Sequence, residues 1–143
     1  MFDYKSSEMI TQKCKYAIKA ILHIARHNHE EKLVFASEIA EQEQIPKKFL
    51  ETILRDLRNH GIISSRRGKF GGYHLLKKPE EITFTEIIRI VDGPIAMLPC
   101  VSLNYYTKCD DCNEEICQIK NVFEKVRNVT LDVLNNSSID KLV

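Results

Sequence analysis

Residues 46–76 have the sequence PKKFLETILRDLRNHGIISSRRGKFGGYHLL, in which a helical pattern runs directly into a glycine-rich hairpin pattern. Pro46 suits the first turn of a helix, and Gly61 suits the position just beyond its end. The apolar residues between them recur at helical spacing and predict one buried stripe, made of Phe49, Leu50, Ile53, Leu54 and Leu57. The opposite face is polar and mostly basic, with Lys47, Lys48, Glu51, Thr52, Arg55 and Arg58.

The residues after this helix predict a two-stranded hairpin. Residues 62–64 and 73–76 have the composition of strands, and residues 65–72 form a basic tip between them. The tip combines cations that contact phosphate with glycines that let the backbone approach a sugar-phosphate chain: Arg66, Arg67, Lys69, Gly68, Gly71 and Gly72. A loop that cradles nucleotide phosphates is the competing interpretation. It needs a helix directly after the glycines and a Lys-Ser/Thr ending, and this stretch has neither.

Two further helices are predicted upstream. A short one lies within residues 33–43, with Ser37 as its N-cap, and a longer amphipathic one runs from about residue 8 to residue 27. Two short helices joined by a tight turn form a helix-turn-helix, whose second helix can enter a DNA major groove. His23 and His27 lie four residues apart on the longer helix, but such a pair without a third ligand is more often polar surface than a metal site.

Positive charge is concentrated in this predicted DNA-reading unit. The net charge of the 143 residues is +1, yet nine lysines and arginines stand against two acids between residues 46 and 78. A local excess of this kind indicates a phosphate-binding face, although a solvated surface stretch is the alternative.

The composition of the chain favours a globular protein and argues against a disordered or membrane-spanning one. With 43% hydrophobic and 29% charged residues, the chain has the composition of one globular domain rather than of a disordered chain. The N-terminus holds no uninterrupted apolar run, so we expect a cytoplasmic protein with no membrane contact. Four of the five cysteines are clustered, namely Cys100, Cys109, Cys112 and Cys117, whereas Cys14 stands apart. Because thiols stay reduced in the cytoplasm, we expect the clustered cysteines to be metal ligands or redox thiols.

The C-terminal third predicts a helix, a loop and a second helix. Thr83 and Glu86 fit a capping box for a helix that Gly93 and Pro94 end near residue 91, and the cysteine loop follows at residues 99–117. Beyond the loop, steps of three and four residues predict a heptad seam on a long helix, made of Ile116, Ile119, Phe123, Val126, Thr130 and Val133. The seam suits dimerisation, with packing against its own domain as the alternative. Residues from 135 onward are polar and expected to fray.

The chemistry of the cysteine loop leaves several functions open. Four thiolates can complete an iron–sulfur cluster, either [2Fe–2S] or [4Fe–4S], and are equally a tetrahedral set for zinc. A thiol switch that oxidises to a disulfide is a third possibility, and no sensory role is a fourth. Four acids near the cysteines disfavour reactive thiolates: Asp110, Asp111, Glu114 and Glu115.

Short motifs spread over almost the whole chain resemble, in order, those of the bacterial Rrf2-type winged-helix regulators. They are Thr11-Gln-Lys-Cys-Lys-Tyr-Ala, Ala36-Ser-Glu-Ile-Ala, Ile45-Pro, Leu50-Glu, Leu57-Arg, Arg67-Gly, Gly71-Gly-Tyr, Ile82-Thr and Val91-Asp-Gly-Pro. The resemblance implies a homodimer that binds a partly palindromic operator, with DNA readers around Lys48, Phe49, Glu51, Thr52 and Arg67. Cluster-binding relatives carry three loop cysteines and, in some cases, an acidic ligand near the partner subunit's N-terminus. This chain has Lys15 at that place and a fourth loop cysteine that can replace the acid.

We therefore expect a mainly α fold with a small β-hairpin, divided into a winged helix-turn-helix at residues 1–80 and a sensor loop with a dimerisation helix at residues 81–143. The expected function is a DNA-binding transcriptional regulator, a repressor, whose operator affinity responds to a cysteine-ligated iron–sulfur cluster. The alternatives are a regulator that uses zinc or a thiol switch, or one that acts through a docked partner protein. No constellation of His, Ser and carboxylate residues indicates an enzyme.

The predicted DNA contacts are Ser37, Lys47, Lys48, Phe49, Glu51, Thr52, Arg55, Arg66, Arg67, Gly68, Lys69, Gly71, Gly72 and Tyr73. The predicted metal ligands are Cys100, Cys109, Cys112 and Cys117.

Overall fold

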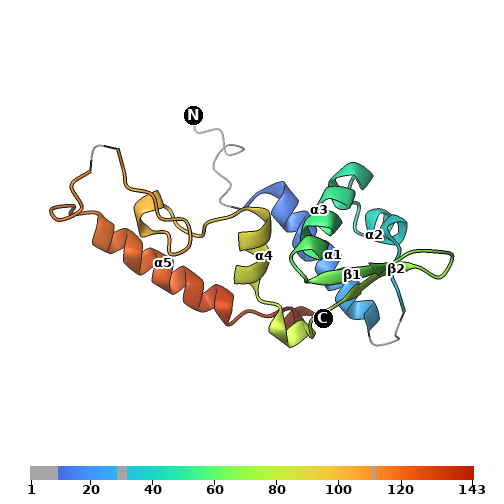
Figure 1. Ribbon diagram of the computed structural model, residues 1–143. Coiled ribbons are helices and arrows are strands. Elements are labelled where there is room, and N and C mark those ends of the chain that lie inside the picture. The colour runs from blue at the N-terminus through green and yellow to red at the C-terminus, as the bar shows by residue number, and fades with distance from the viewer. Residues whose placement is uncertain (1–9, 29–31, 111) are drawn as a thin grey trace.

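The computed structural model describes residues 10–28, 32–110 and 112–143. Its elements follow in the order α1 (Gln12–His27), α2 (Ala36–Gln42), α3 (Lys47–Asn59), β1 (Ile63–Arg66), β2 (Gly72–Leu75), α4 (Phe84–Val91) and α5 (Lys120–Asn135), with short 3-10 turns at Pro79–Glu81, Pro99–Val101 and Ile139–Leu142. Figure 1 shows α1, α2, α3 and the hairpin in a compact head, from which α5 and the cysteine loop extend away. The predicted mainly α fold with a small hairpin is confirmed.

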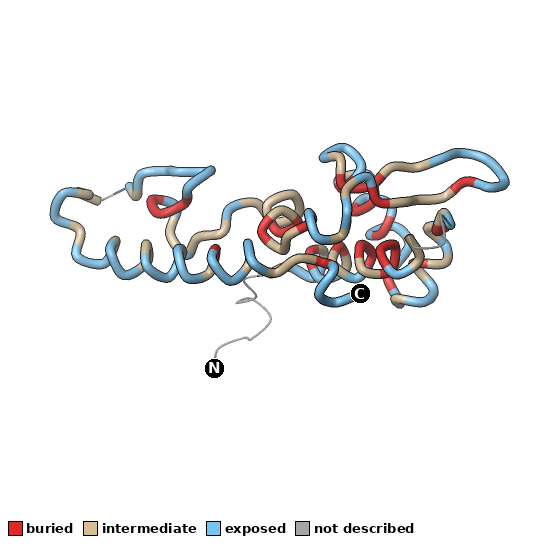
Figure 2. Tube along the Cα trace, turned by 90° about the horizontal axis from the view of Figure 1, so that it is seen from below, coloured by how far each residue is buried: buried red, intermediate tan, exposed pale blue. Residues whose placement is uncertain are grey.

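The core of the head is the contact between α1, α3 and their neighbours. Leu50, Ile53, Leu54 and Leu57 are fully buried, as the stripe predicts, but Phe49 is 53% exposed and was wrongly included in it. Its ring instead meets the edge of Tyr16, with the ring centroids 6.3 Å apart. Figure 2 shows that buried residues gather in the head, whereas most of α5 is exposed.

Helix starts depart from the predictions at two places. Helix α1 begins at Gln12, because Thr11 caps it by accepting a 3.1 Å hydrogen bond from the Cys14 amide, while residue 8 lies outside the described residues. Helix α2 begins at Ala36, with Phe35 as its N-cap and no side-chain capping bond. Ser37 is therefore an exposed residue of the first turn and not the cap.

The hairpin forms as predicted, but its strands begin and end at slightly different residues. Ile63 pairs with Leu75 and Arg66 pairs with Gly72, so the first strand continues to Arg66 and the tip is residues 67–71. The second strand also bridges to the segment before α2, since Val34 and Tyr73 exchange two backbone hydrogen bonds of 3.0 and 2.7 Å. This third backbone contact fixes the hairpin against the head.

Helix α4 and the C-terminus complete the head. The Thr83 side chain caps α4 by accepting a 3.3 Å bond from the Glu86 amide, and Gly93, with a φ of 94°, follows its end, both as predicted. The prediction that residues from 135 onward fray is wrong. Ile139 is fully buried in the core, and its amide donates a 3.0 Å bond to the Ile82 carbonyl.

Within the described ranges, none of the helices combines the length and the apolar character that crossing a membrane requires.

Candidate DNA interface and cysteine centre

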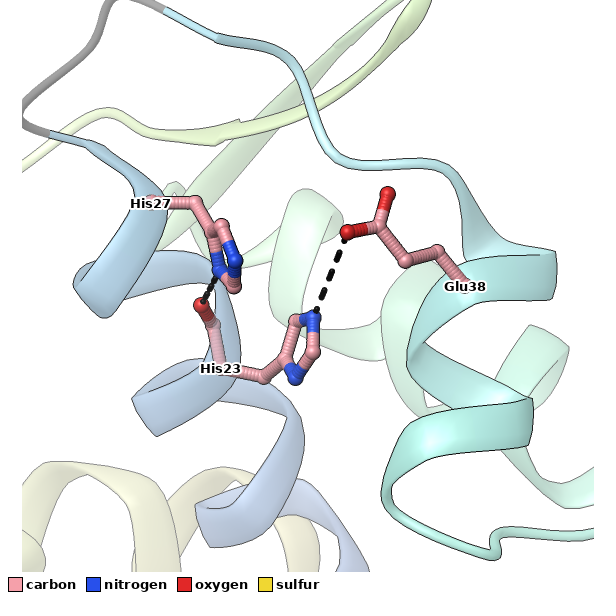
Figure 3. A group of neighbouring side chains, drawn as sticks. All are labelled: His23, His27 and Glu38. Carbon is pink, nitrogen blue, oxygen red and sulfur yellow. Dashed lines mark hydrogen bonds and ion pairs between the residues drawn. The ribbon is translucent and has the colours of Figure 1, made fainter.

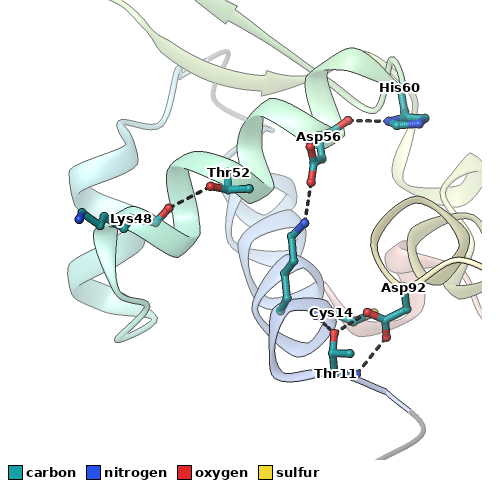
Figure 4. A network of polar contacts seen from close by, with 8 residues as sticks. Thr11, Cys14, Lys48, Thr52, Asp56, His60 and Asp92 are labelled. Carbon is teal, nitrogen blue, oxygen red and sulfur yellow. Dashed lines mark hydrogen bonds and ion pairs between the residues drawn. The ribbon is translucent and has the colours of Figure 1, made fainter.

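Helix α3 presents a continuous polar face on the surface of the head. Burial of its apolar stripe turns the predicted DNA-contacting side chains outward, and all of them are exposed: Lys47, Lys48, Phe49, Glu51, Thr52 and Arg55. The Thr52 hydroxyl donates a 3.2 Å bond to the Lys48 carbonyl within the helix (Figure 4). The geometry allows this helix to enter a major groove with its first two turns foremost.

An ion pair on the other side of α3 compensates the negative charge of one of the two acidic residues of this helix. Asp56 lies on the inner side of α3, where the Lys13 ammonium of α1 is 2.7 Å from its carboxylate (Figure 4). The negative charge is therefore compensated within the head. Glu51 alone among the acids between residues 46 and 78 stays on the outer face, so that face remains strongly basic.

The tip of the hairpin, which we call the wing, carries the exposed residues Arg67 and Lys69. Its glycines have different roles. A Cβ atom on Gly68 would meet nothing within 4 Å, whereas one on Gly71 would lie 2.2 Å from the Arg66 carbonyl oxygen and one on Gly72 would lie 2.9 Å from the Val34 oxygen. Gly71 and Gly72 thus permit close approach of the chain's own backbone, and Gly68 is the tip glycine that is open to a ligand.

A groove of about 310 Å³ lies between the wing and the helix-turn-helix. Three arginines line it, Arg58, Arg66 and Arg67, together with the half-buried Tyr73. Arg58 and Ser65 link its two walls through a 3.5 Å hydrogen bond. The helix and the wing therefore form one basic surface rather than two separate ones.

The four clustered cysteines lie on one loop and are all unoxidised. Cys100 is buried in the 3-10 turn Pro99–Val101, and the other three are half-buried. Burial and then a side-chain hydrogen bond with Cys109 raise the pKa of Cys100. Burial and then a hydrogen bond with Cys117 raise the pKa of Cys112, with further contributions from the charges of Cys109 and Cys100. The four thiols thus form two hydrogen-bonded pairs, Cys100 with Cys109 and Cys112 with Cys117, and the two pairs also interact through their charges.

Cys117 differs from the others because it lies at the start of α5. The backbone amides of Lys120 and Ile119 donate hydrogen bonds that lower its pKa, and the Lys120 charge adds to this effect. The nearby Glu114 carboxylate accepts bonds from the Tyr106 hydroxyl and, at 3.1 Å, from the Lys120 ammonium. The expected opposition of acids to thiolates is thereby reduced for Glu114, while Asp111 lies outside the described residues.

Cys14 is not part of this centre. It is fully buried in α1, and burial, the negative charge of Asp92 and a hydrogen bond to that carboxylate raise its pKa to about 12. The same carboxylate accepts a 2.9 Å bond from the Thr11 amide (Figure 4). Cys14 is therefore a protonated thiol at neutral pH, unsuited to metal ligation.

Hydrogen bonds connect the cysteine loop to α5, and the chain after α5 to the head. The Arg127 guanidinium donates a 2.7 Å bond to the Val101 carbonyl, next to Cys100. Just beyond the C-terminal end of α5, the Ser137 carbonyl accepts a 3.0 Å bond from the amide of Phe84, the first residue of α4. The cysteine loop and the head are therefore both connected to α5 by hydrogen bonds.

Helix α5 exposes a stripe of valines, which we call the valine stripe: Val122, Val126, Val129 and Val133. They recur at steps of four, three and four residues, which is heptad spacing. The predicted seam is only partly right, because Phe123 and Thr130 are half-buried against their own chain, and Ile116 and Ile119 precede the helix. Val122 and Val129 were missed although the same spacing signals them.

Comparisons with known proteins agree with this architecture. The family model Rrf2, described as an iron-dependent transcriptional regulator, matches residues 10–143. An rrf2-like HTH-type transcriptional regulator of Rhodobacter capsulatus is 49% identical over 122 residues, which cover 82% of this chain and 81% of that protein. The HTH-type transcriptional regulator IscR of Pectobacterium atrosepticum is 31% identical over 134 residues, which cover 94% of this chain and 78% of that protein.

Among solved structures, the chain is similar to CymR, described as the global cysteine regulator of B. subtilis. The TM-score is 0.76 at 26% sequence identity, and the match covers 94% of this chain and 95% of that one.

Proposed function

The chain belongs to the Rrf2 family of transcriptional regulators, and from this premise we propose that it binds operator DNA as a homodimer whose affinity depends on an iron–sulfur cluster at Cys100, Cys109, Cys112 and Cys117. It is a regulator and not an enzyme. The observation that carries the proposal is the attachment of a four-thiol loop, through Arg127 and α5, to a head with a basic α3 and wing. As an operator-binding protein it would act in the bacterial cytoplasm, where thiols stay reduced.

In the proposed complex, α3 reads base edges and the wing holds the DNA backbone. Lys47, Lys48 and Arg55 are exposed on α3, and Arg67 and Lys69 are exposed on the wing. Cationic side chains on both elements would neutralise phosphates and release counterions, so operator affinity should fall steeply with salt. Ser37, exposed at the start of α2, would approach the same DNA backbone.

Replacing Arg67 with alanine should weaken operator binding about tenfold, because one charge-assisted contact is lost, and should reduce the salt slope by about 1. Fluorescence anisotropy at several salt concentrations measures both quantities. Lys125→Ala is the matched control, since it removes an exposed cation from α5, which extends away from the head (Figure 1). Equal affinities for Arg67→Ala and the unmodified protein would refute the wing assignment.

The proposed dimer forms through the valine stripe. Four exposed valines at heptad spacing suit packing against the same stripe of a second copy, since that packing removes them from water. A dimer presents two copies of α3 and so accounts for a partly palindromic operator.

The donor set of the loop fits an iron–sulfur cluster. Its four thiols interact in two pairs, and the amides at the start of α5 favour the thiolate form of Cys117. When bound, a cluster supplies a centre that reacts with oxidants and small ligands. Residues of the protein would connect this centre to the DNA-binding head. Arg127 and Lys120 link the loop to α5, and the Ser137 and Ile139 contacts link α5 to the head. DNA affinity changes only if the cluster is held differently in the bound and free states.

A second candidate is a cysteine-responsive or thiol-based regulator without a cluster, and the structural similarity to CymR supports it. Zinc at the same four thiols is a structural alternative. Regulation through a docked partner protein is another. Absorption spectroscopy of the protein purified without oxygen, with iron, sulfide and zinc assayed on the same sample, separates the cluster and zinc from the two alternatives without metal. A pulldown without DNA tests for the docked partner. Sulfide-to-iron charge-transfer bands support the cluster, and a colourless protein without iron refutes it.

Cys112→Ala should lose most of the iron and sulfide while the chain stays folded, because Cys112 is only half-buried. Cys14→Ala should keep both, since burial and Asp92 hold that thiol protonated. Iron and sulfide analysis measures the cofactor, and circular dichroism measures the fold. Equal iron content in the Cys112→Ala variant and the unmodified protein would exclude Cys112 as a ligand.

A further inference from the structure

His23 is a buried histidine with one unsatisfied nitrogen. It lies on α1 with 2% of its surface exposed, and its Nδ1 is 2.9 Å from the Glu43 carboxylate at the end of α2. Because a carboxylate only accepts, Nδ1 carries the proton of the neutral ring, and Nε2 keeps a free lone pair. That Nε2 is buried and has no hydrogen-bond partner. An unpaired buried polar atom is costly and calls for a ligand.

His27 offers a second lone pair one turn further along α1. Its ring stacks on that of His23, with centroids 4.7 Å apart and an interplanar angle of 29°. Its Nδ1 is 2.8 Å from the His23 carbonyl oxygen, which can only accept, so Nδ1 carries the proton here too. Nε2 of His27 is therefore also free to act as a ligand.

Glu38 supplies the third group from the first turn of α2 (Figure 3). One of its carboxylate oxygens is 3.9 Å from His23 Nε2, which is too far for a hydrogen bond. One potential ligand atom from each of His23, His27 and Glu38 lies within 4.8 Å of the other two. Sequence spacing gives only the histidine pair, and the packing of α2 on α1 adds the carboxylate.

We propose that His23, His27 and Glu38 form a binding site for a divalent transition-metal ion such as Zn²⁺, separate from the cysteine loop. Two imidazoles and a carboxylate are an established three-ligand set for zinc, with water in the fourth position. Zinc ligands about 2.1 Å from the ion lie roughly 3.4 Å from one another in a tetrahedron. The flexible Glu38 side chain therefore has to move inward by only a small distance.

The surroundings of the histidines match those of metal-ligating imidazoles. Such rings donate their second nitrogen to a carboxylate or a backbone carbonyl, which fixes the tautomer and increases ligand basicity. Glu43 does this for His23, and the His23 carbonyl does it for His27. The site would join α1 to α2, the first helix of the helix-turn-helix, and it does not depend on the proposed function.

Titration of the full-length protein with Co²⁺, a spectroscopic substitute for Zn²⁺, tests this site. Cobalt bound to thiolates gives intense sulfur-to-metal charge-transfer bands, whereas a site of nitrogen and oxygen ligands gives only weak d–d bands. We expect one equivalent to bind without sulfur bands, in addition to any cobalt at the cysteine loop. Zn²⁺ should displace it.

Four variants identify the ligands. Glu38→Gln and His27→Ala should each weaken this equivalent at least about 100-fold, and Glu43→Gln should weaken it about 10- to 100-fold by loosening His23. His60→Ala is the matched control, because its Nδ1 also bonds a backbone carbonyl four residues earlier, at 2.8 Å, but on the exposed end of α3 (Figure 4). Circular dichroism checks that each variant is folded.

Two results would overturn the site. One is the absence of a cobalt equivalent without sulfur bands in the unmodified protein. The other is equal binding in Glu38→Gln, His27→Ala and the unmodified protein.

Discussion

Val129→Asp is expected to convert the protein from a dimer to a monomer and to weaken operator binding by about 10²- to 10⁴-fold. Val129 is 66% exposed in the single chain and lies in the middle of the valine stripe. In the proposed dimer an aspartate at this position would be buried against the valine stripe of the second copy, and burying an unpaired charge costs several kcal/mol. Losing the second α3 then removes the effective-concentration advantage of two linked DNA-reading helices.

Analytical ultracentrifugation measures the mass, and anisotropy measures operator affinity. Asn121→Asp is the matched control, since it places the same side chain on an exposed position of α5 outside the stripe. That variant should remain dimeric. A dimeric Val129→Asp protein with unchanged operator affinity would show that the stripe is not the dimer interface.

Ile139→Ala is expected to lower the free energy of unfolding by about 2–5 kcal/mol. Ile139 is fully buried among residues of α1 and the core of the head, so truncation leaves a cavity beneath the DNA-reading unit. Leu142→Ala is the control from the same 3-10 turn. Because Leu142 is 51% exposed, its replacement should change stability by less than about 0.5 kcal/mol.

Equilibrium urea unfolding of both variants, prepared without bound metal, compares these free energies. Similar values for Ile139→Ala and Leu142→Ala would mean that the C-terminal turn contributes nothing specific to the core. The expected difference would instead establish that the chain end is a structural part of the head.

Local patterns were sufficient for much of the fold. The stripe on α3, the Thr83 cap and Gly61 after α3 depend on residues within one or two turns, and the structure has each of them except for Phe49 in the stripe. The glycines of the wing were recognised as close-approach positions, but the partner of Gly72 is Val34 and not a ligand. That contact joins segments far apart in the sequence, which no local pattern encodes.

The errors have the same origin. On α5, Phe123 and Thr130 satisfy heptad spacing as well as Val122 and Val129 do, and the choice depends on which face of the helix packs on the rest of the chain. A polar C-terminal segment predicts fraying unless the pocket for Ile139 is known. In the same way, Glu38 becomes a neighbour of the histidines only through the packing of α2 on α1.

The position of Ile139 also means that the core of the head is completed only late in the synthesis of the chain. The head gains its last core side chain, and the backbone bond from Ile139 to Ile82, only after the cysteine loop and α5 have been translated. A nascent chain still lacking residue 139 therefore carries every side chain that is proposed to contact DNA on an incomplete core. Ribosomes that stall within α5 would therefore release fragments with an incomplete core, and such fragments are easily degraded.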